Sequence, residues 1–200
     1  MSDPETITVY DNRADDYARK LGNDPVASIA LRAFIADLPA GGLVLDLGCG
    51  PGTWAAAMAR AGLKVEAFDA STQMVALTSQ HPDVTVWQAE FSDLNAAERY
   101  DGIWANFSLL HAPRTHMPDH LRSISRALKP GGIVHIGLKY GDGTARDGLG
   151  RLYSYYTPES LAPMLDQAGL TPGPARQGKD KGLDGTPARW FTVTATKEGS

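Results

Sequence analysis

Five short apolar runs alternate with helical patterns between residues 43 and 139, and this alternation limits the possible folds more than any other feature of the chain. The runs are LVLDL at 43–47, KVEAFD at 64–69, VTVWQ at 84–88, YDGIWANF at 100–107 and GIVHIGLK at 132–139. Such runs are typical of strands buried on both faces, and strands that alternate with helices form parallel sheets through right-handed crossovers. The sequence therefore predicts an α/β fold with a Rossmann-like, doubly wound sheet and helices on both faces.

The segments outside this alternation predict the two ends of the fold. Apolar residues between Asp24 and Leu38 recur along one face of a helix, which would belong to an N-terminal helical cap. The run RWFTVTATK at 189–197 alternates like an antiparallel strand, and a weaker strand near 170–177 precedes it. We therefore expect a seven-stranded sheet that is mostly parallel and ends in an antiparallel hairpin.

Two later helices have clear boundary signals. A helix over 118–128 is expected to stop at the Pro-Gly-Gly run 130–132. Thr157 and Pro158 predict the cap and first turn of a helix that runs to Gly169. Pro163 removes a hydrogen bond inside this second helix, so we expect a kink there or a later start.

Size and charge favour one domain that does not act mainly on nucleic acid. The 200 residues (21.4 kDa) suit a single domain, divided into a helical cap at 1–40, a core at 41–139 and a loop, helix and hairpin at 140–200. Lys and Arg number 19 against 23 Asp and Glu, a formal net charge of −4 without any block of like charge.

The single cysteine and the lack of a recognisable signal peptide are consistent with a reducing compartment. The single cysteine, Cys49, excludes an internal disulfide and a cysteine-based metal site. The N-terminus does not resemble a signal peptide, and no run approaches the roughly 18 apolar residues that span a bilayer. We expect a soluble cytoplasmic protein, a monomer or weak homodimer, with no membrane or nucleic-acid partner.

A glycine-rich turn follows the first predicted strand. Gly48, Gly50 and Gly52 form G-x-G-x-G before a helix, where a ligand can approach backbone N–H groups without meeting a Cβ. The dinucleotide fingerprint G-x-G-x-x-G fails from Gly48 because of Thr53, and passes weakly from Gly50 through Ala55. Spacing alone leaves the cofactor open, and glycines that serve only a tight turn are the alternative.

Asp69 ends the second predicted strand, 17 residues after Gly52. An acid at about this separation binds ribose hydroxyls in nucleotide-binding βαβ units. The alternative is a helix N-cap, for which Ser71 competes.

Together these blocks resemble a known family. LVLDLGCGPGTW, FDAS, AEFSDL, YDGIWANFSLLH and LKPGGIVHIGLK are similar, in order and spacing, to the signature blocks of class I S-adenosylmethionine (SAM)-dependent methyltransferases. The resemblance covers roughly residues 43–139 and favours SAM over NAD. Upstream, YDNRADDYA resembles the lead-in of the small-molecule branch, which includes quinone and tellurite methyltransferases.

The resemblance implies a set of cofactor-binding residues. Around the methionine portion of SAM it places Gly48, Gly50 and Gly52, Asp46 oriented to the ammonium through water, and a lid that carries Tyr10 and Tyr17. Around the nucleoside and the cavity floor it places Asp69, Ala70, Met74, Glu90, Phe91, Ala105, Asn106 and Phe107. Plain core packing is the alternative for the two tyrosines, and surface charge is the alternative for Glu90.

The acceptor side is expected after strands four and five. His111 has a near-neutral reference pKa that suits a base, and a capping or packing role is the alternative. The Gly-, Arg- and Tyr-rich stretch 140–156 is too polar for a core element, so we expect a functional loop. Its candidate substrate-binding residues are Arg146, Arg151, Tyr153 and Tyr155. A solvated loop held by Asp142 and Asp147 explains the same residues.

The predicted function is methyl transfer from SAM to an unidentified small-molecule acceptor by in-line displacement, with S-adenosylhomocysteine (SAH) as product. No metal is expected, because Pro118 begins a helix that leaves His116 outside it and so separates His116 from His120. An NAD-dependent oxidoreductase and a non-catalytic SAM-binding regulatory protein are the alternative functions.

Overall fold

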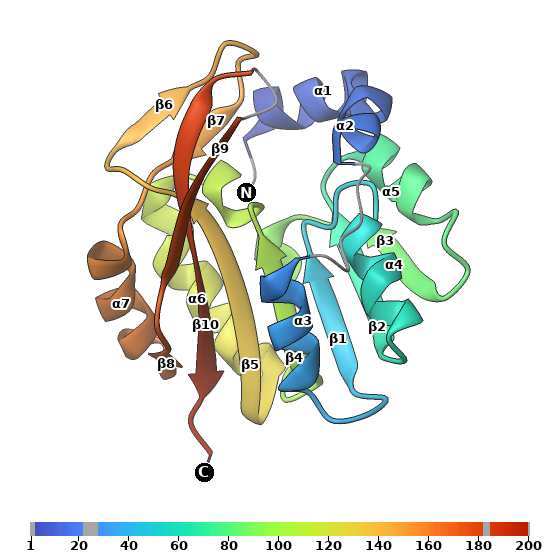
Figure 1. Cartoon of the computed structure of the whole chain (residues 1–200), viewed down its shortest axis with the longest axis vertical. Coiled ribbons are helices and arrows are strands. Elements are labelled where there is room, and N and C mark those ends of the chain that lie inside the picture. The colour runs from blue at the N-terminus through green and yellow to red at the C-terminus, as the bar shows by residue number, and fades with distance from the viewer. Residues whose placement is uncertain (1–2, 22–27, 182–184, 200) are drawn as a thin grey trace.

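An eight-stranded sheet runs through the centre of the computed structural model, which describes residues 3–21, 28–181 and 185–199 (Figure 1). The strand order is β3-β2-β1-β4-β5-β10-β8, with β9 paired to β10. The strands of this sheet are β1 Leu43–Leu47, β2 Lys64–Asp69, β3 Val84–Gln88, β4 Tyr100–Asn106, β5 Leu128–Lys139, β8 Leu170–Pro172, β9 Arg176–Lys181 and β10 Pro187–Lys197. β1 to β5 are parallel and β10 is antiparallel to β5, which confirms the predicted α/β fold.

The C-terminal part of the sheet has one more strand than the sequence predicted. The segment near 170–177, expected as one weak strand, divides into β8 and β9. β8 pairs with the end of β10 and β9 pairs with its beginning. β8 ends at Pro172, and Pro174 follows before β9 begins; neither proline has an N–H to donate to a neighbouring strand, so the segment cannot pair continuously.

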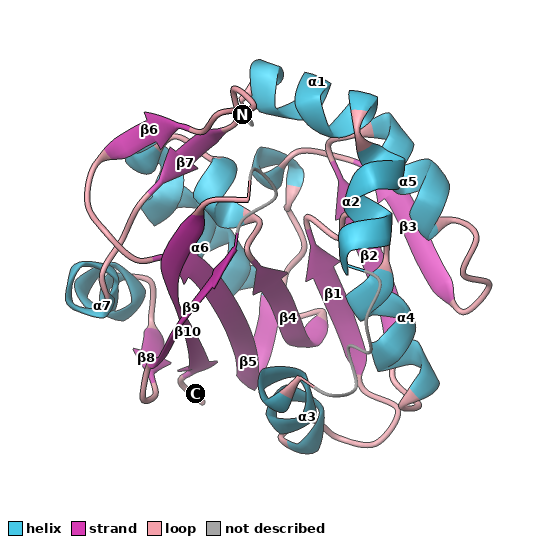
Figure 2. Ribbon diagram, turned by 45° about the horizontal axis from the view of Figure 1, so that its top comes forward, coloured by secondary structure: helices cyan, strands magenta, loops and turns pink. Residues whose placement is uncertain are grey.

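Helices cover both faces of the sheet (Figure 2). They are α1 Pro4–Asn12, α2 Ala14–Leu21, α3 Ile29–Ala36, α4 Thr53–Arg60, α5 Thr72–Thr78, α6 Met117–Ala127 and α7 Pro158–Gln167. On one face the buried residues of α6 and α7 pack into the larger core cluster, and on the other face those of α3 and α4 pack into a second cluster. No helix in the described residues is long and apolar enough to cross a membrane.

Two helix boundaries differ from the sequence predictions. The helix expected over 24–38 begins at Ile29 with Ser28 as its cap, while residues 24–27 lie outside the described ranges. α6 ends at Ala127 and β5 begins at Leu128, so the Pro-Gly-Gly run lies inside the strand and does not stop the helix.

Of the two outcomes expected from Pro163, a kink or a later start of α7, the later start is wrong, and the predicted cap and first turn at Thr157 and Pro158 are confirmed. The helix begins at Pro158 and includes Pro163, because Thr157 and Ser160 form a capping box that fixes its first turn. Leu161 and Leu165 are buried and hold the helix on the sheet despite the hydrogen bond that Pro163 removes.

The segment 140–156 is more ordered and more buried than its polarity predicted. It contains a separate hairpin, β6 Thr144–Arg146 with β7 Leu152–Ser154. Arg151 is only 1% exposed and Tyr153 only 4%, which corrects the expectation that this stretch is too polar for the core. The hairpin and α1 lie at the end of the sheet toward which β1 and β4 point (Figure 1).

Candidate functional site

A pocket opens beneath α1, at the carboxyl ends of the central parallel strands, which is the position where open α/β sheets bind ligands. Its walls come from the helices α1, α2, α4 and α5 and from the segments that follow β1, β2, β3 and β4. The residues that line it are Asp3, Thr6, Ile7, Tyr10, Tyr17, Gly48, Cys49, Gly50, Pro51, Trp54, Asp69, Ala70, Ser71, Met74, Phe91, Asn106, Phe107, Ser108 and His111.

Most of the predicted cofactor residues converge on this pocket. Those on its walls are Tyr10, Tyr17, Gly48, Gly50, Asp69, Ala70, Met74, Phe91, Asn106 and Phe107. Four others, Asp46, Gly52, Glu90 and Ala105, do not line it. Ala105 is fully buried in β4, and the backbone N–H of Glu90 donates to Asp93 Oδ2 (2.8 Å) at the start of the 3₁₀ turn Phe91–Asp93.

The three glycines of the loop after β1 all have positive φ, but they meet different surroundings. A Cβ on Gly48 (φ +75°) would lie 2.4 Å from Ser108 Cβ, and one on Gly52 (φ +79°) would lie 2.8 Å from Thr78 Oγ1. A Cβ on Gly50 (φ +55°) would meet only the Tyr17 ring, at 3.6 Å. Gly48 and Gly52 are therefore required by packing, whereas Gly50 presents its backbone to the pocket.

Asp69 holds this loop in place through both carboxylate oxygens. Oδ2 accepts the N–H of Gly50 and Oδ1 accepts the N–H of Ser71, each at 2.9 Å. The N-cap of α5 is Ser71, whose Oγ accepts from Met74, so the alternative of Asp69 as the helix cap is wrong. Burial raises the pKa of Asp69, and its two backbone N–H partners oppose that shift.

Asp46 is a buried carboxyl group with an unused acceptor. It is 2% exposed, and its Oδ2 has no hydrogen-bond partner among the residues that the structure describes. Burial first, and then the nearby charge of Asp69, raise the pKa of Asp46 to about 8, while the Ala55 N–H acts in the opposite direction. The Asp46 carboxyl group is therefore mostly protonated at neutral pH.

This pKa predicts how an Asp46→Asn variant responds to pH. Between the ordinary value of 3.8 and about 8, the unfolded chain releases a proton that the folded chain keeps, so wild-type stability falls as pH rises through this window. Asparagine does not titrate, so the melting temperature of the variant should exceed that of the wild type by an amount that grows from pH 4 to pH 8 and vanishes below pH 4. Thermal melts across this range test the prediction, and a pH-independent difference would contradict it.

His111 lies between α1 and the β6–β7 hairpin and is fully engaged in hydrogen bonds. Its Nδ1 lies 2.7 Å from the carbonyl oxygen of Leu152, which must accept, so Nδ1 carries the proton and Nε2 accepts from the Tyr10 hydroxyl at 2.8 Å. The same hydroxyl accepts from Arg151 Nη1 at 2.9 Å. Burial lowers the pKa of His111 to about 3, so the imidazole is neutral at pH 7.

The predicted substrate-binding residues separate into two pairs. Arg151 and Tyr153 line a second cavity, which adjoins the first through the shared residues Tyr10, Tyr17, Phe107 and His111. The remaining lining residues of this cavity are Leu110, Lys139, Asp180, Lys181, Ala188, Arg189 and Trp190. The other pair, Arg146 and Tyr155, lines neither cavity.

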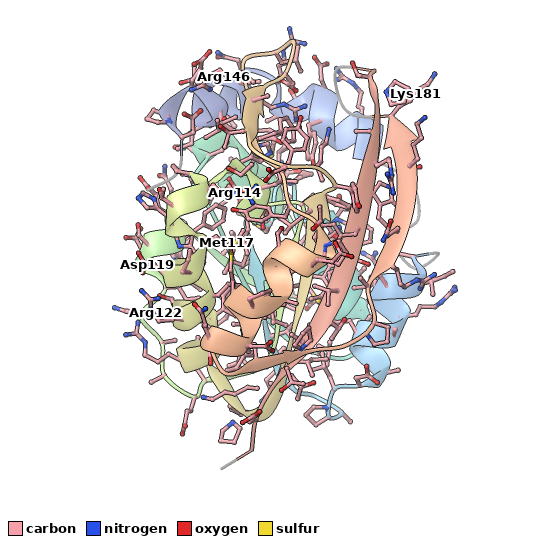
Figure 3. All side chains as sticks on the ribbon, turned by 90° about the vertical axis from the view of Figure 1, so that its left-hand side faces the viewer. Arg114, Met117, Asp119, Arg122, Arg146 and Lys181 are labelled. Atoms are coloured by element: carbon pink, nitrogen blue, oxygen red, sulfur yellow. The ribbon has the colours of Figure 1, made fainter. Side chains whose placement is uncertain are left out.

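Arg146 instead holds α1 over the pocket. Its guanidinium forms ion pairs with Asp3 (2.9 Å) and Glu5 (3.2 Å), and Figure 3 shows it at the end of the molecule where α1 lies. At the other end of the helix, Ser71 Oγ donates to Asp11 Oδ1 at 2.6 Å. Because both ends are attached, α1 covers the pocket as a lid.

Sequence reasoning missed Lys139 and Trp190 in the second cavity. Lys139 ends β5, and the carboxyl end of a parallel strand was a usable signal. Trp190 is its partner in β10 and belongs to a run that predicted only a strand. No group of three or more histidine, cysteine or acidic residues in the described ranges is arranged to hold a metal ion. His116 is the N-cap residue of α6 and lies outside the helix, as predicted.

Comparisons with known proteins find similar sequences among methyltransferases. A family described as a methyltransferase domain matches residues 44–132. The cypemycin N-terminal methyltransferase of a Streptomyces species is 33% identical over 68% of this chain, and a ubiquinone biosynthesis O-methyltransferase of Xanthomonas axonopodis pv. citri is 28% identical over 66%. The chain spans 57% and 64% of the lengths of these two relatives.

Solved structures share the fold over nearly the whole chain. The 1,6-didemethyltoxoflavin-N1-methyltransferase of Burkholderia thailandensis, solved with SAH, superposes with a TM-score of 0.72 at 24% identity, covering 99% of this chain and 92% of the other. A TehB-like SAM-dependent methyltransferase of Corynebacterium glutamicum gives 0.69 at 20% identity, covering 98% and 100%. The methyltransferase-domain match over residues 44–132 and these sequence relatives support a class I SAM-dependent methyltransferase with relatives in the small-molecule branch, and the solved structures share its fold.

Proposed function

We propose that this chain binds SAM beneath α1 and transfers its methyl group to a small molecule held in the adjoining cavity. The observation that carries the proposal is the wall common to the two cavities, formed by Tyr10, Tyr17, Phe107 and His111. A methyl donor in one cavity and an acceptor in the other would meet beside these shared residues. Holding the two reactants in line accounts for much of the rate enhancement of such a displacement.

The residues of the first pocket fit the parts of SAM. The unpartnered Oδ2 of Asp46 suits an ammonium group, reached through water because Asp46 lies off the pocket wall. Gly50 leaves room for close backbone contact with the methionine portion, and the Asp69 carboxylate beside it has lone pairs for ribose hydroxyls. Met74 and Phe91 offer apolar surface for the adenine ring.

When bound, SAM supplies a methyl carbon on a sulfonium: an acceptor lone pair forms the new bond to that carbon while the electron pair of the broken C–S bond goes to sulfur and leaves SAH. The chain's own residues orient both molecules, exclude water and receive any proton that the acceptor loses. The Tyr10 hydroxyl lies on the shared wall and donates to His111 Nε2, so a proton accepted by the Tyr10 oxygen can leave along that hydrogen bond. The depressed pKa makes His111 a weak base, and positioning therefore carries most of the catalysis.

Replacing His111 tests this proton route. His111→Ala should lower turnover by about ten- to a hundredfold, toward the lower end of general-base effects, and leave SAH affinity within about threefold. His116→Ala is the matched control, since that imidazole lines neither cavity. Wild-type turnover in His111→Ala would exclude the residue from the mechanism.

The proposed function itself is tested by calorimetry and product analysis. We expect SAM and SAH to bind with micromolar affinity, and labelled SAM incubated with a metabolite extract to yield a labelled small molecule. SAM binding without any labelled product would favour the non-catalytic SAM-binding alternative. Enhanced NADH fluorescence without SAM binding would support an oxidoreductase and overturn the proposal.

A further inference from the structure

The second cavity combines an aromatic lining with positive charge. Besides Tyr10, Tyr17 and Phe107 on the shared wall, Tyr153 and Trp190 present aromatic surface to it. We infer that the acceptor is a planar aromatic molecule that carries an anionic group, with its ring against Trp190 and its charge at Lys139. This inference rests on the proposed function, since it assigns the substrate class of the same enzyme.

Trp190 forms a fixed wall of this cavity. The indole lies directly on the backbone of Gly178, where a Cβ would come within 2.2 Å of Cζ2. Its Nε1 donates to Asp180 Oδ2 at 2.7 Å, and the Phe107 ring meets it edge-on at 6.2 Å. A ring held from three sides loses little freedom when a second ring stacks on it, which favours a flat aromatic ligand over a flexible aliphatic one.

Lys139 brings a positive charge to the same wall. It pairs with Trp190 across β5 and β10, so the two side chains lie on the same face of the sheet. Its Nζ lies 4.4 Å from the centre of the Tyr153 ring, which in turn lies 4.8 Å from the His111 ring. The ammonium is therefore close to the shared wall, where an anion on the acceptor would be held beside the reacting atoms.

The other charges around the cavity are partly matched by the protein. Arg151 is buried against Asp147, with its Nη2 at 2.6 Å from Oδ2, and Asp180 accepts from Trp190. Lys181 and Arg189 also line the cavity, from the strands β9 and β10. Among the described lining residues, positively charged side chains therefore outnumber negatively charged ones, although the net charge of the whole chain is negative. A cationic acceptor would be repelled by this excess of positive charge.

Binding of matched probes to the SAH complex tests the inference. With SAH saturating, 3,4-dihydroxybenzoate should bind at least tenfold more tightly than its neutral amide and than the non-aromatic acid cyclohexanecarboxylate, by calorimetry or ligand-observed NMR. Equal binding of acid and amide would overturn the anionic assignment, and equal binding of the two acids would overturn the aromatic one. Failure of SAH itself to bind would contradict the proposed function instead.

Two variants connect the preference to the named residues. Lys139→Met should weaken the binding of dihydroxybenzoate at least tenfold and leave the binding of the amide unchanged. Lys139→Arg should restore the binding of dihydroxybenzoate. Lys179→Met, a control on the exposed strand β9, should change the affinity for neither probe. Gly178→Ala should displace Trp190 and weaken both aromatic probes without changing SAH affinity. Its control is Gly148→Ala, where a Cβ meets nothing within 4 Å. A Lys139→Met protein that still prefers the acid would overturn the role of Lys139.

Discussion

Gly50→Leu is expected to abolish SAH binding, with an affinity at least a hundredfold below wild type, while the protein still unfolds cooperatively. A hundredfold loss corresponds to about 2.7 kcal/mol of binding free energy. The reason is steric, because the Gly50 backbone faces the pocket and a Cβ there points at the Tyr17 ring, 3.6 Å away. A leucine side chain would fill the space between the loop and the lid, where the methionine portion of SAM is proposed to lie.

The fold should tolerate this change because the cost is local. A non-glycine residue at φ +55° costs about 1–2 kcal/mol, and a chain of this length loses about 2–4 °C in melting temperature per kcal/mol. The Asp69 carboxylate accepts from the Gly50 backbone N–H, which leucine also has, so the loop keeps this contact.

Two other glycines provide the controls. Gly62→Leu carries similar backbone strain at φ +89° but meets nothing within 4 Å, so it should lower stability without changing SAH affinity. Gly48→Ala should destabilise the fold more than either, because its Cβ would lie 2.4 Å from Ser108 Cβ. Retained SAH binding in Gly50→Leu, measured by calorimetry, would show that the cofactor does not pass this glycine.

Arg151→Met is expected to lower the free energy of unfolding by about 3–5 kcal/mol, or about 6–20 °C in melting temperature. Arg151 is 1% exposed, and its guanidinium contacts the Asp147 carboxylate through both Nε and Nη2. Removing it leaves that carboxylate buried without its counter-charge. It also removes the donor to the Tyr10 hydroxyl, which loosens α1 over the pocket.

A double-mutant cycle separates this structural role from substrate binding. Asp147→Asn should also destabilise the chain, and the double variant should lose less stability than the sum of the two single changes because the pair acts as a unit. Arg146→Met removes ion pairs of a guanidinium that is 41% exposed, so it should lower stability less than Arg151→Met does. An Arg151→Met protein with wild-type stability and weakened acceptor binding would favour the expectation of a substrate-facing arginine.

Much of the fold and part of the site follow from local patterns. The five parallel strands were predictable because each is a contiguous apolar run that is followed by glycine or polar residues. The glycine loop and Asp69 were predictable as a unit because strand ends determine where their side chains emerge. The division of residues 170–181 into β8 and β9 was not, since it depends on which part of β10 each strand meets.

The acceptor side shows why composition misled the prediction there. Arg151 and its neighbours look solvated in sequence, but Asp147 lies four residues before Arg151 and neutralises it inside the fold. Arg146 looked equivalent to Arg151, yet it pairs with Asp3 and Glu5 at the other end of the chain. The two ion pairs of Arg146 join residues more than 140 positions apart, and no local pattern encodes them.

The sequence by itself determined the parallel sheet and the edge at which its central strands end beside the glycine loop, because strand burial and glycine turns act over a few neighbouring residues. Only the tertiary structure decided which glycine faces the pocket, which arginine is structural, and that Lys139 and Trp190 share a wall. These depend on contacts between segments distant in sequence: α1 against the β6–β7 hairpin, and β10 against β5. Packing of those segments, more than their composition, determines the shape and charge of the second cavity.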